Sequence, residues 1–202
     1  MTDRTSTHAT TAPLTSESLQ RITRFSRDLG QLTTLPAIAE RVLSELLELA
    51  QHPEGTLYLA EHEHADFRRL AEYGSDNPHT TPATLSHRDP LIEQLARNPQ
   101  TYDESIYALF KPEHGASVAL SNGVCFHAAI PLTSKGRLVA CALLHKTAAS
   151  DGHNCEPVDI LAPMAQIAAN ALDSMLVYED LRQSRSEEHT SELQSHSFIS
   201  YA

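Results

Sequence analysis

The 202-residue sequence contains little of several residue types, and each shortage excludes a class of protein. It has only three cysteines, at unrelated spacings, so a disulfide framework is excluded and a reducing, cytoplasmic location is expected. Lysine and arginine total 15 against 26 aspartates and glutamates, and the net charge of −11 argues against nucleic acid or membrane partners. No apolar run approaches the roughly 20 residues of a membrane helix. The polar, Thr-rich start, Met1 to Pro13, does not predict a signal peptide.

Glycine is also scarce, and the usual catalytic motifs are missing. Seven glycines leave no phosphate-binding loop, and neither a nucleophile elbow nor a zinc-binding helix motif occurs. The 12 histidines are scattered: His62-Glu63-His64 lacks a third ligand, and His153 with Cys155 falls short of the four that a structural zinc site needs. We therefore expect surface histidines, no metal, no cofactor and no catalytic residue.

Apolar residues at three- and four-residue steps predict two helices near the N-terminus. The first has Ser16 or Ser18 as its N-cap, and the second starts at Thr34 with Pro36 in its first turn. The residues that define the two apolar faces are Leu19, Ile22, Phe25, Leu29 and Leu32, then Ile38, Val42, Leu46 and Leu49.

The remaining pattern predicts an α+β fold with a single central antiparallel sheet of about five strands. N- and C-terminal helices flank this sheet, and a helical insert covers residues 75–123. The expected strands are 55–60, 67–73, 124–132 and 138–146, with a short one at 100–102, and 74–87 is expected to be a loop. Strict alternation would place Phe67, Arg69, Ala71 and Tyr73 on one face. Helices are expected at 91–97 and 156–182, the latter with Pro163 as a kink or restart, and a helical turn at 105–110.

Four segments, in order and spacing, resemble a GAF domain over about residues 18–182. They are Leu35 to Leu49, Glu54-Gly-Thr-Leu-Tyr-Leu59, Ala129-Ile-Pro-Leu132 followed by Gly136 to Leu143, and Ile160 to Leu181. The resemblance implies a regulatory sensor domain of a bacterial signal-transduction protein, either a sensor histidine kinase or a cyclic-dinucleotide enzyme. It implies no catalysis by this chain, with the output enzyme domain expected beyond Ser184.

The resemblance also implies a site for an unknown small ligand between the sheet and the insert. Tyr102, Tyr107, Phe110 and His127 are the residues expected to line it. An insert packed shut, without a ligand, is an equal alternative. The cyclic-nucleotide signature of some relatives is absent after Lys146.

Two further functions are alternatives to a sensor. Some GAF proteins are free methionine sulfoxide reductases with a cysteine nucleophile, but Cys141, flanked by alanines, is typical of a core position. Cys125 and His127 would share one face of a strand, yet the neighbouring motif for attachment of a bilin is missing. The other alternative is a dimerisation module without a ligand.

Apolar stripes on the terminal helices predict a homodimer. The stripe of the last helix, from Leu161 to Tyr178, is wide enough for the sheet and a partner, and Leu19 to Leu32 has no obvious use inside the domain. The resemblance implies parallel pairing that continues into a signalling coiled coil.

Three parts of the chain are expected. Residues 1–15 are a disordered lead, 16–184 are the sensory domain, and 185–202 are a tail that is not native. Arg185 to His196 and Ile199 to Ala202 resemble the translation of sequencing-adapter DNA on either side of its variable index.

Overall fold

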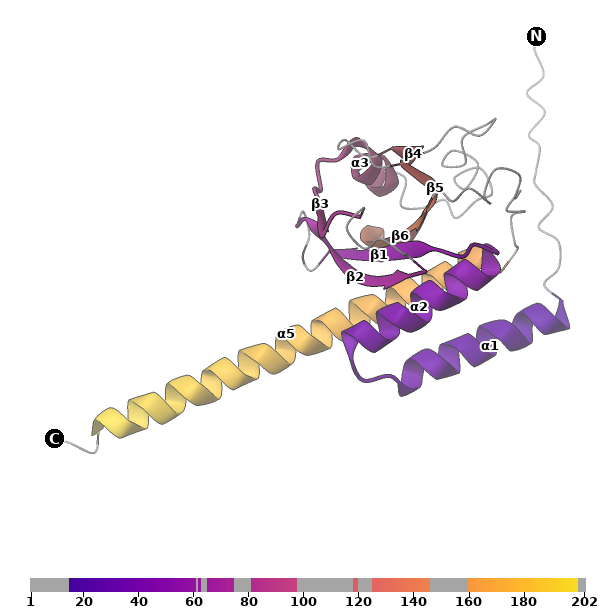
Figure 1. Cartoon of the computed structure of the whole chain (residues 1–202). Helices are drawn as coiled ribbons and strands as arrows, with labels where there is room; N and C mark the ends of the chain where they lie inside the picture. Colours follow the sequence, from indigo (N-terminus) through magenta and orange to yellow (C-terminus); the bar gives the residue numbers. More distant parts are fainter. Residues whose placement is uncertain are drawn as a thin grey trace, which may run out of the picture.

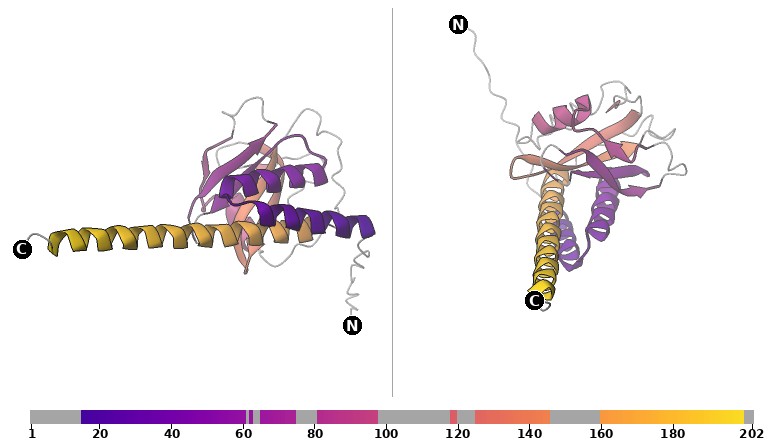
Figure 2. Two further views of the ribbon diagram at one scale, coloured as in Figure 1. Left: turned by 90° about the horizontal axis from the view of Figure 1, so that it is seen from below. Right: turned by 90° about the vertical axis from the view of Figure 1, so that its left-hand side faces the viewer.

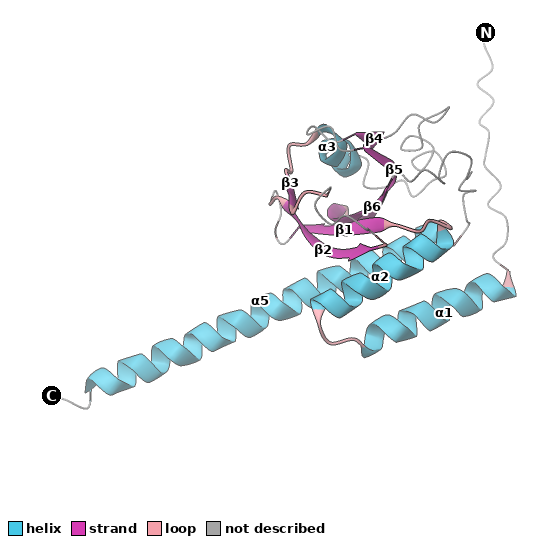
Figure 3. Ribbon diagram, viewed as in Figure 1, coloured by secondary structure: helices cyan, strands magenta, loops and turns pink. Residues whose placement is uncertain are grey.

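The computed structural model describes residues 15–60, 62, 65–74, 81–97, 118–119, 125–145 and 160–199. Figure 3 shows the elements: α1 (Ser16–Gln31), α2 (Leu35–Leu49), β1 (Gly55–Ala60), β2 (Phe67–Tyr73), β3 (Thr84–Leu85), α3 (Pro90–Arg97), β4 (Val118–Ala119), β5 (Cys125–Ser134), β6 (Arg137–His145) and α5 (Leu161–Ile199). Among these described residues, no helix is long and apolar enough to cross a membrane.

The described strands form one antiparallel sheet in the order β3-β2-β1-β6-β5-β4, which confirms the predicted α+β fold. The two edge strands, β3 and β4, are two residues long. The prediction of an uninterrupted loop over 74–87 was wrong at Thr84–Leu85, which pairs with Arg68 and Phe67. Two residues are too few to leave a periodic signal in a segment rich in Pro, Thr and Ser.

The helices lie on both faces of the sheet (Figures 1 and 2). α2 and the first half of α5 cover one face, here called the helix side, and α1 packs outside α2 and α5. α3 lies over the other face, here called the insert side. α5 continues well past the edge of the sheet.

The helix side holds the larger apolar core. The small residues Ala140 and Ala142 of β6 face it, while Cys141 faces the insert side, and all three are fully buried. A central strand covered on both faces was predicted from these small residues, and the structure confirms it. The largest contributions to the helix-side core come from Phe25, Leu43, Leu46, Leu57, Leu59, Leu132, Leu144, Met164 and Leu172.

α1 has a use inside the domain that the sequence analysis missed. Phe25 and Leu29 are buried against α2 and α5, although Leu19 is exposed. The cap also differs from the prediction, because the Thr15 hydroxyl, not that of Ser16 or Ser18, accepts the backbone N–H of Ser18 at 3.1 Å.

An ion-pair network fixes α1 to α2. The carboxylate of Glu45 on α2 is almost fully buried. It forms ion pairs with Nε of Arg21 on α1 at 2.7 Å and with Nη1 of Arg41 at 2.6 Å. Arg41 also pairs with Asp28 of α1 at 3.0 Å, and its guanidinium lies over the ring of Phe25. Charges that pair in this geometry give α1 one defined position on α2.

A β-bulge corrects the predicted alternation in β2. Leu57 pairs with Ala71 but Tyr58 pairs with Arg69, so Leu70 is an extra residue. Phe67 therefore lies on the insert side and Ala71 on the helix side, whereas strict alternation would put them together.

A second bulge falls in β5. Phe126 pairs with His145 and Ala128 with Leu144, which leaves His127 as the extra residue. The simple alternation predicted for Cys125 and His127 does not apply there, because a bulge shifts the faces of the residues on either side of it.

α5 starts later and ends later than predicted. Its first residue is Leu161, so Pro163 lies in the first turn. The backbone N–H groups of a first turn have no acceptor inside the helix, so a proline there removes no hydrogen bond and causes no break. The backbone remains helical to Ile199, beyond the predicted end at Arg182.

Candidate functional site

Most of the predicted ligand site lies outside the described residues. Tyr102, Tyr107 and Phe110 belong to a segment that the structure does not describe. His127 lies in β5, but its side chain is likewise outside the described part. The lining of that site by these four residues therefore stays a prediction.

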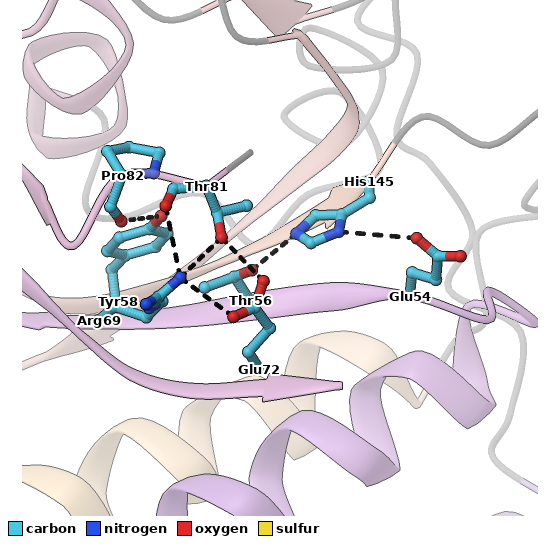
Figure 4. A network of polar contacts seen from close by, with 8 residues as sticks. All are labelled: Glu54, Thr56, Tyr58, Arg69, Glu72, Thr81, Pro82 and His145. Carbon is cyan, nitrogen blue, oxygen red and sulfur yellow. Dashed lines mark hydrogen bonds and ion pairs between the residues drawn. The ribbon is translucent and has the colours of Figure 1, made fainter. Parts of the chain in front are cut away.

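The described part of the insert side carries a buried polar network (Figure 4). At its centre, the hydroxyl of Thr56 on β1 lies 2.6 Å from Nε2 of His145 at the end of β6. Oε2 of Glu54 lies 3.8 Å from Nδ1 of the same ring, and the backbone N–H of His145 donates to the backbone carbonyl of Glu54 at 3.1 Å. Because β1 and β6 are neighbours, their pairing brings residues 89 positions apart into contact.

The position of His145 in the sheet favours the neutral form of its ring. Burial lowers its pKa below the ordinary value, although the carboxylates of Glu72 and Glu54 oppose the shift. The ring is packed against Phe126, with centroids 5.7 Å apart. A neutral imidazole has one donor and one acceptor nitrogen, so this group can exchange hydrogen-bond roles with a neighbour without changing charge.

A second set of contacts ties Thr81 to β2 and Pro82 to β1. The Arg69 guanidinium donates to Glu72 at 3.0 Å and to the Thr81 hydroxyl at 2.8 Å, and that hydroxyl donates to Glu72 at 2.7 Å. The Tyr58 hydroxyl donates to the carbonyl of Pro82 at 2.8 Å. Burial raises the pKa of Tyr58 well above its ordinary value, so the phenol remains a donor.

α3 closes the other end of this face. Leu91, Ile92 and Leu95 are buried against the sheet, and the Asp89 carboxylate caps the helix by accepting the N–H of Leu91 at 3.0 Å. Cys141 belongs to the same cluster and is fully buried, as predicted for a core position. Burial also raises the pKa of its thiol, which is the opposite of what a cysteine nucleophile requires.

These residues can bind and orient, but they do not form a metal centre. Within the described ranges, no group of three or more His, Cys, Asp or Glu side chains is placed to hold an ion. The sequence analysis missed Thr56, Arg69 and Glu72. The signal for Thr56 was a polar residue in the otherwise apolar strand 55–60, on the same face as Tyr58.

The helix side offers a second candidate surface. A groove of about 490 Å³ lies between α1 and α5, with Ser26, Gly30, Asn170, Ser174 and Met175 among its lining residues. Next to it, α5 exposes Val177, Tyr178 and Leu181. A row of exposed large apolar side chains on one helix is typical of a contact surface.

No protein-family model matches the sequence, and no curated protein is similar to it.

Several solved structures share the fold. The GAF domain of a proposed sensor histidine kinase from Pseudomonas syringae pv. tomato is 16% identical, with a TM-score of 0.52, over 84% of this chain and 94% of that one. The GAF domain of an Acinetobacter phosphoenolpyruvate-protein phosphotransferase is 10% identical, with a TM-score of 0.51, over 79% and 95%. PelD from Pseudomonas aeruginosa is 18% identical, with a TM-score of 0.51, over 79% of this chain and half of that one. The chain therefore has the fold of a GAF domain.

Proposed function

We propose that this chain is a regulatory GAF-fold domain of a bacterial signal-transduction protein and works in the cytoplasm. It receives a small ligand or a protein signal on the insert side and passes the signal on through α5. The observation that carries the proposal is the two-sided build: buried hydrogen-bonding groups face one way, and a projecting helix with exposed apolar residues leaves from the other face. The fold alone does not decide this function, since one fold serves many activities.

We propose further that α5 pairs with α5 of a second copy. Val177, Tyr178 and Leu181 are 49%, 59% and 60% exposed, and their spacing puts them on one side of the helix. An apolar stripe on a projecting helix is stabilised when the same stripe of another copy covers it, as in a coiled coil. Pairing of this kind would carry a change in the domain to an output enzyme, such as a histidine kinase or a cyclic-dinucleotide enzyme.

Disulfide crosslinking tests the pairing. In a Cys125→Ser, Cys155→Ser background, which keeps the buried Cys141, Tyr178→Cys should give a crosslinked dimer under mild oxidation. Glu179→Cys is the matched control, because its position points away from the stripe, and it should crosslink at least tenfold more slowly. Equal crosslinking at both positions, or none at Tyr178→Cys, would remove the support for pairing of α5, here called the exit helix.

A dimerisation module without a ligand is the second candidate. It is favoured by the closure of the network, since Arg69, Glu72 and Thr81 satisfy one another. A thermal-shift panel of amino acids, nucleotides, cyclic nucleotides and organic acids separates the two candidates. A rise in melting temperature with one compound, abolished by Thr56→Val or Arg69→Gln, supports the sensor; a crosslinked dimer that no compound stabilises supports the module.

A further inference from the structure

Asp173 of α5 is the single point at which the exit helix is ionically attached to the β5–β6 turn within the described residues. Its carboxylate accepts the Ser134 hydroxyl at 2.9 Å and the Arg137 guanidinium at 2.7 Å. The exposed Lys135 amino group lies 3.4 Å away. The Asp173 side chain is only 7% exposed, so the contact is shielded from competing water.

The backbone of the hairpin is shaped for this contact. Lys135 and Gly136 both have positive φ values, 52° and 77°, which is the conformation of a tight two-residue turn. A bulge follows on β6, where Leu132 pairs with Ala140 and Thr133 with Leu138, leaving Val139 as the extra residue. Without that extra residue, strand alternation would turn Arg137 to the insert side, away from Asp173.

The charge on Asp173 is maintained by the same contacts. Burial alone would raise the pKa of this carboxyl, but the hydrogen bonds from Ser134 and Arg137 outweigh it, so the pKa lies below the ordinary value. About two turns earlier on α5, the Gln166 side-chain amide donates to the carbonyl of Thr133 at 3.0 Å. The turn therefore contacts α5 at two places about two helical turns apart.

Strand β6 joins this contact to the insert-side network. It begins at Arg137, which is bonded to α5, and ends at His145, which is bonded to Thr56. Its middle is fully buried, with Ala140, Cys141 and Ala142 held between β1 and β5. A close-packed interior transmits small displacements instead of absorbing them, so the two ends of β6 are mechanically linked.

We propose that the contact of Asp173 with Ser134 and Arg137 is a latch that makes the position of α5 depend on β6. A displacement of β6 at its His145 end is then passed to the exit helix through the β5–β6 turn. The proposal deepens the proposed function and rests on it, because it names the route by which the insert side reaches α5.

Amide hydrogen exchange of the full chain, read on peptides from 161–178, tests the latch without a ligand. Thr56→Val removes the hydroxyl partner of His145 at nearly unchanged volume and should speed exchange in these peptides about threefold or more. In an Asp173→Asn background, the same Thr56→Val change should alter the exchange rate of these peptides by less than about 1.5-fold. Asp180→Asn, an exposed acid on the same helix, is the matched background and should leave the Thr56→Val effect intact.

Two further variants keep the test decisive. Tyr58→Phe breaks a hydrogen bond on the same face that does not involve β6. After correction for the global loss of stability of each variant, it should not change exchange in α5. Ser134→Ala replaces Asp173→Asn if that variant does not fold. A Thr56→Val effect of equal size with and without the latch, or no effect on α5 at all, overturns the proposal. Exchange reports on contacts within one subunit, whereas crosslinking at Tyr178→Cys reports on pairing between subunits. Either proposal can therefore be contradicted while the other is supported.

Discussion

The two faces of the sheet are built from different chemistry. On the helix side, apolar residues of α1, α2, α5 and four strands form one continuous core, with ion pairs such as Arg21 to Glu45 at its margin. On the insert side, a smaller apolar cluster under α3 adjoins the buried pair of Thr56 and His145 and the partly buried contact of Arg69 with Glu72. The same strands serve both faces, because alternate residues point in opposite directions.

This difference separates stability from recognition. Burial of apolar area is the dominant stabilising term and has no direction, so the helix side gives the domain its scaffold. Buried hydrogen-bonding groups contribute less net stability but fix orientation, which is why we propose the insert side as the face that receives a ligand or partner. Substitutions should therefore be costly on the helix side and affect ordering or pH response on the insert side.

The largest effect is expected for a cavity in the helix-side core. Leu46→Ala removes a fully buried side chain from α2 and should lower the free energy of unfolding by about 3 kcal/mol in urea denaturation. Leu19→Ala, at an exposed position of α1, is the control and should cost less than about 0.5 kcal/mol. Similar losses for both would mean that α2 is not part of the principal core.

The next effect concerns the ion pairs that dock α1. Glu45→Gln leaves two arginines without their shared buried carboxylate and should cost roughly 2 kcal/mol. Glu48→Gln removes a partner of Arg21 that is 68% exposed and should cost under about 0.5 kcal/mol. Denaturation of the two variants at low salt checks the ranking; a greater loss for Glu48→Gln would contradict the described docking.

A smaller loss is expected on the insert side. Tyr58→Phe removes the donor to the Pro82 carbonyl and should lower the free energy of unfolding by about 1 kcal/mol. Exchange should increase mainly in peptides that contain residues 81–85, because the hydroxyl holds that segment to β1. An unchanged exchange rate there would show that Arg69 and Thr81 hold the segment without Tyr58.

The smallest effect is a pH dependence that His145 contributes. Because its pKa is lowered in the folded protein, the folded state binds this proton less readily than the unfolded state. Stability is therefore retained above the ordinary histidine pKa of about 6.5 and falls as pH decreases from there towards the folded pKa. His145→Gln should reduce the loss of stability between pH 7.5 and 5.5, whereas His62→Gln, at an exposed position, should not. Equal pH slopes in all three proteins would contradict a buried, neutral His145.

The helices and strands could be predicted from the sequence, but the faces to which the strand residues point could not. The apolar steps of α2, the strand 55–60 and the small residues Ala140 and Ala142 each pointed to the observed element. The bulges at Leu70, His127 and Val139 could not be predicted, because one extra residue changes the pairing register without changing composition. These bulges decide which side chains reach Asp173 and which face the network.

The candidate site was less accessible to prediction for a related reason. Thr56 and His145 lie far apart in the sequence and meet only because β1 and β6 are neighbours. The predicted lining residues Tyr102, Tyr107 and Phe110 remain predictions, since the described residues do not include them. The burial of Phe25 and Leu29 was missed for a similar reason, because nothing local in α1 indicates where it packs.

The most direct measurement of the central claim is the molar mass of the chain in solution by light scattering across a concentration series. If α5 pairs with α5 of a second copy, the unsubstituted chain should have the mass of two chains. The account predicts the mass of one chain, with unchanged circular dichroism, after Val177→Ser, Tyr178→Ser and Leu181→Ser together. The mass of a single chain at every concentration before substitution would contradict it.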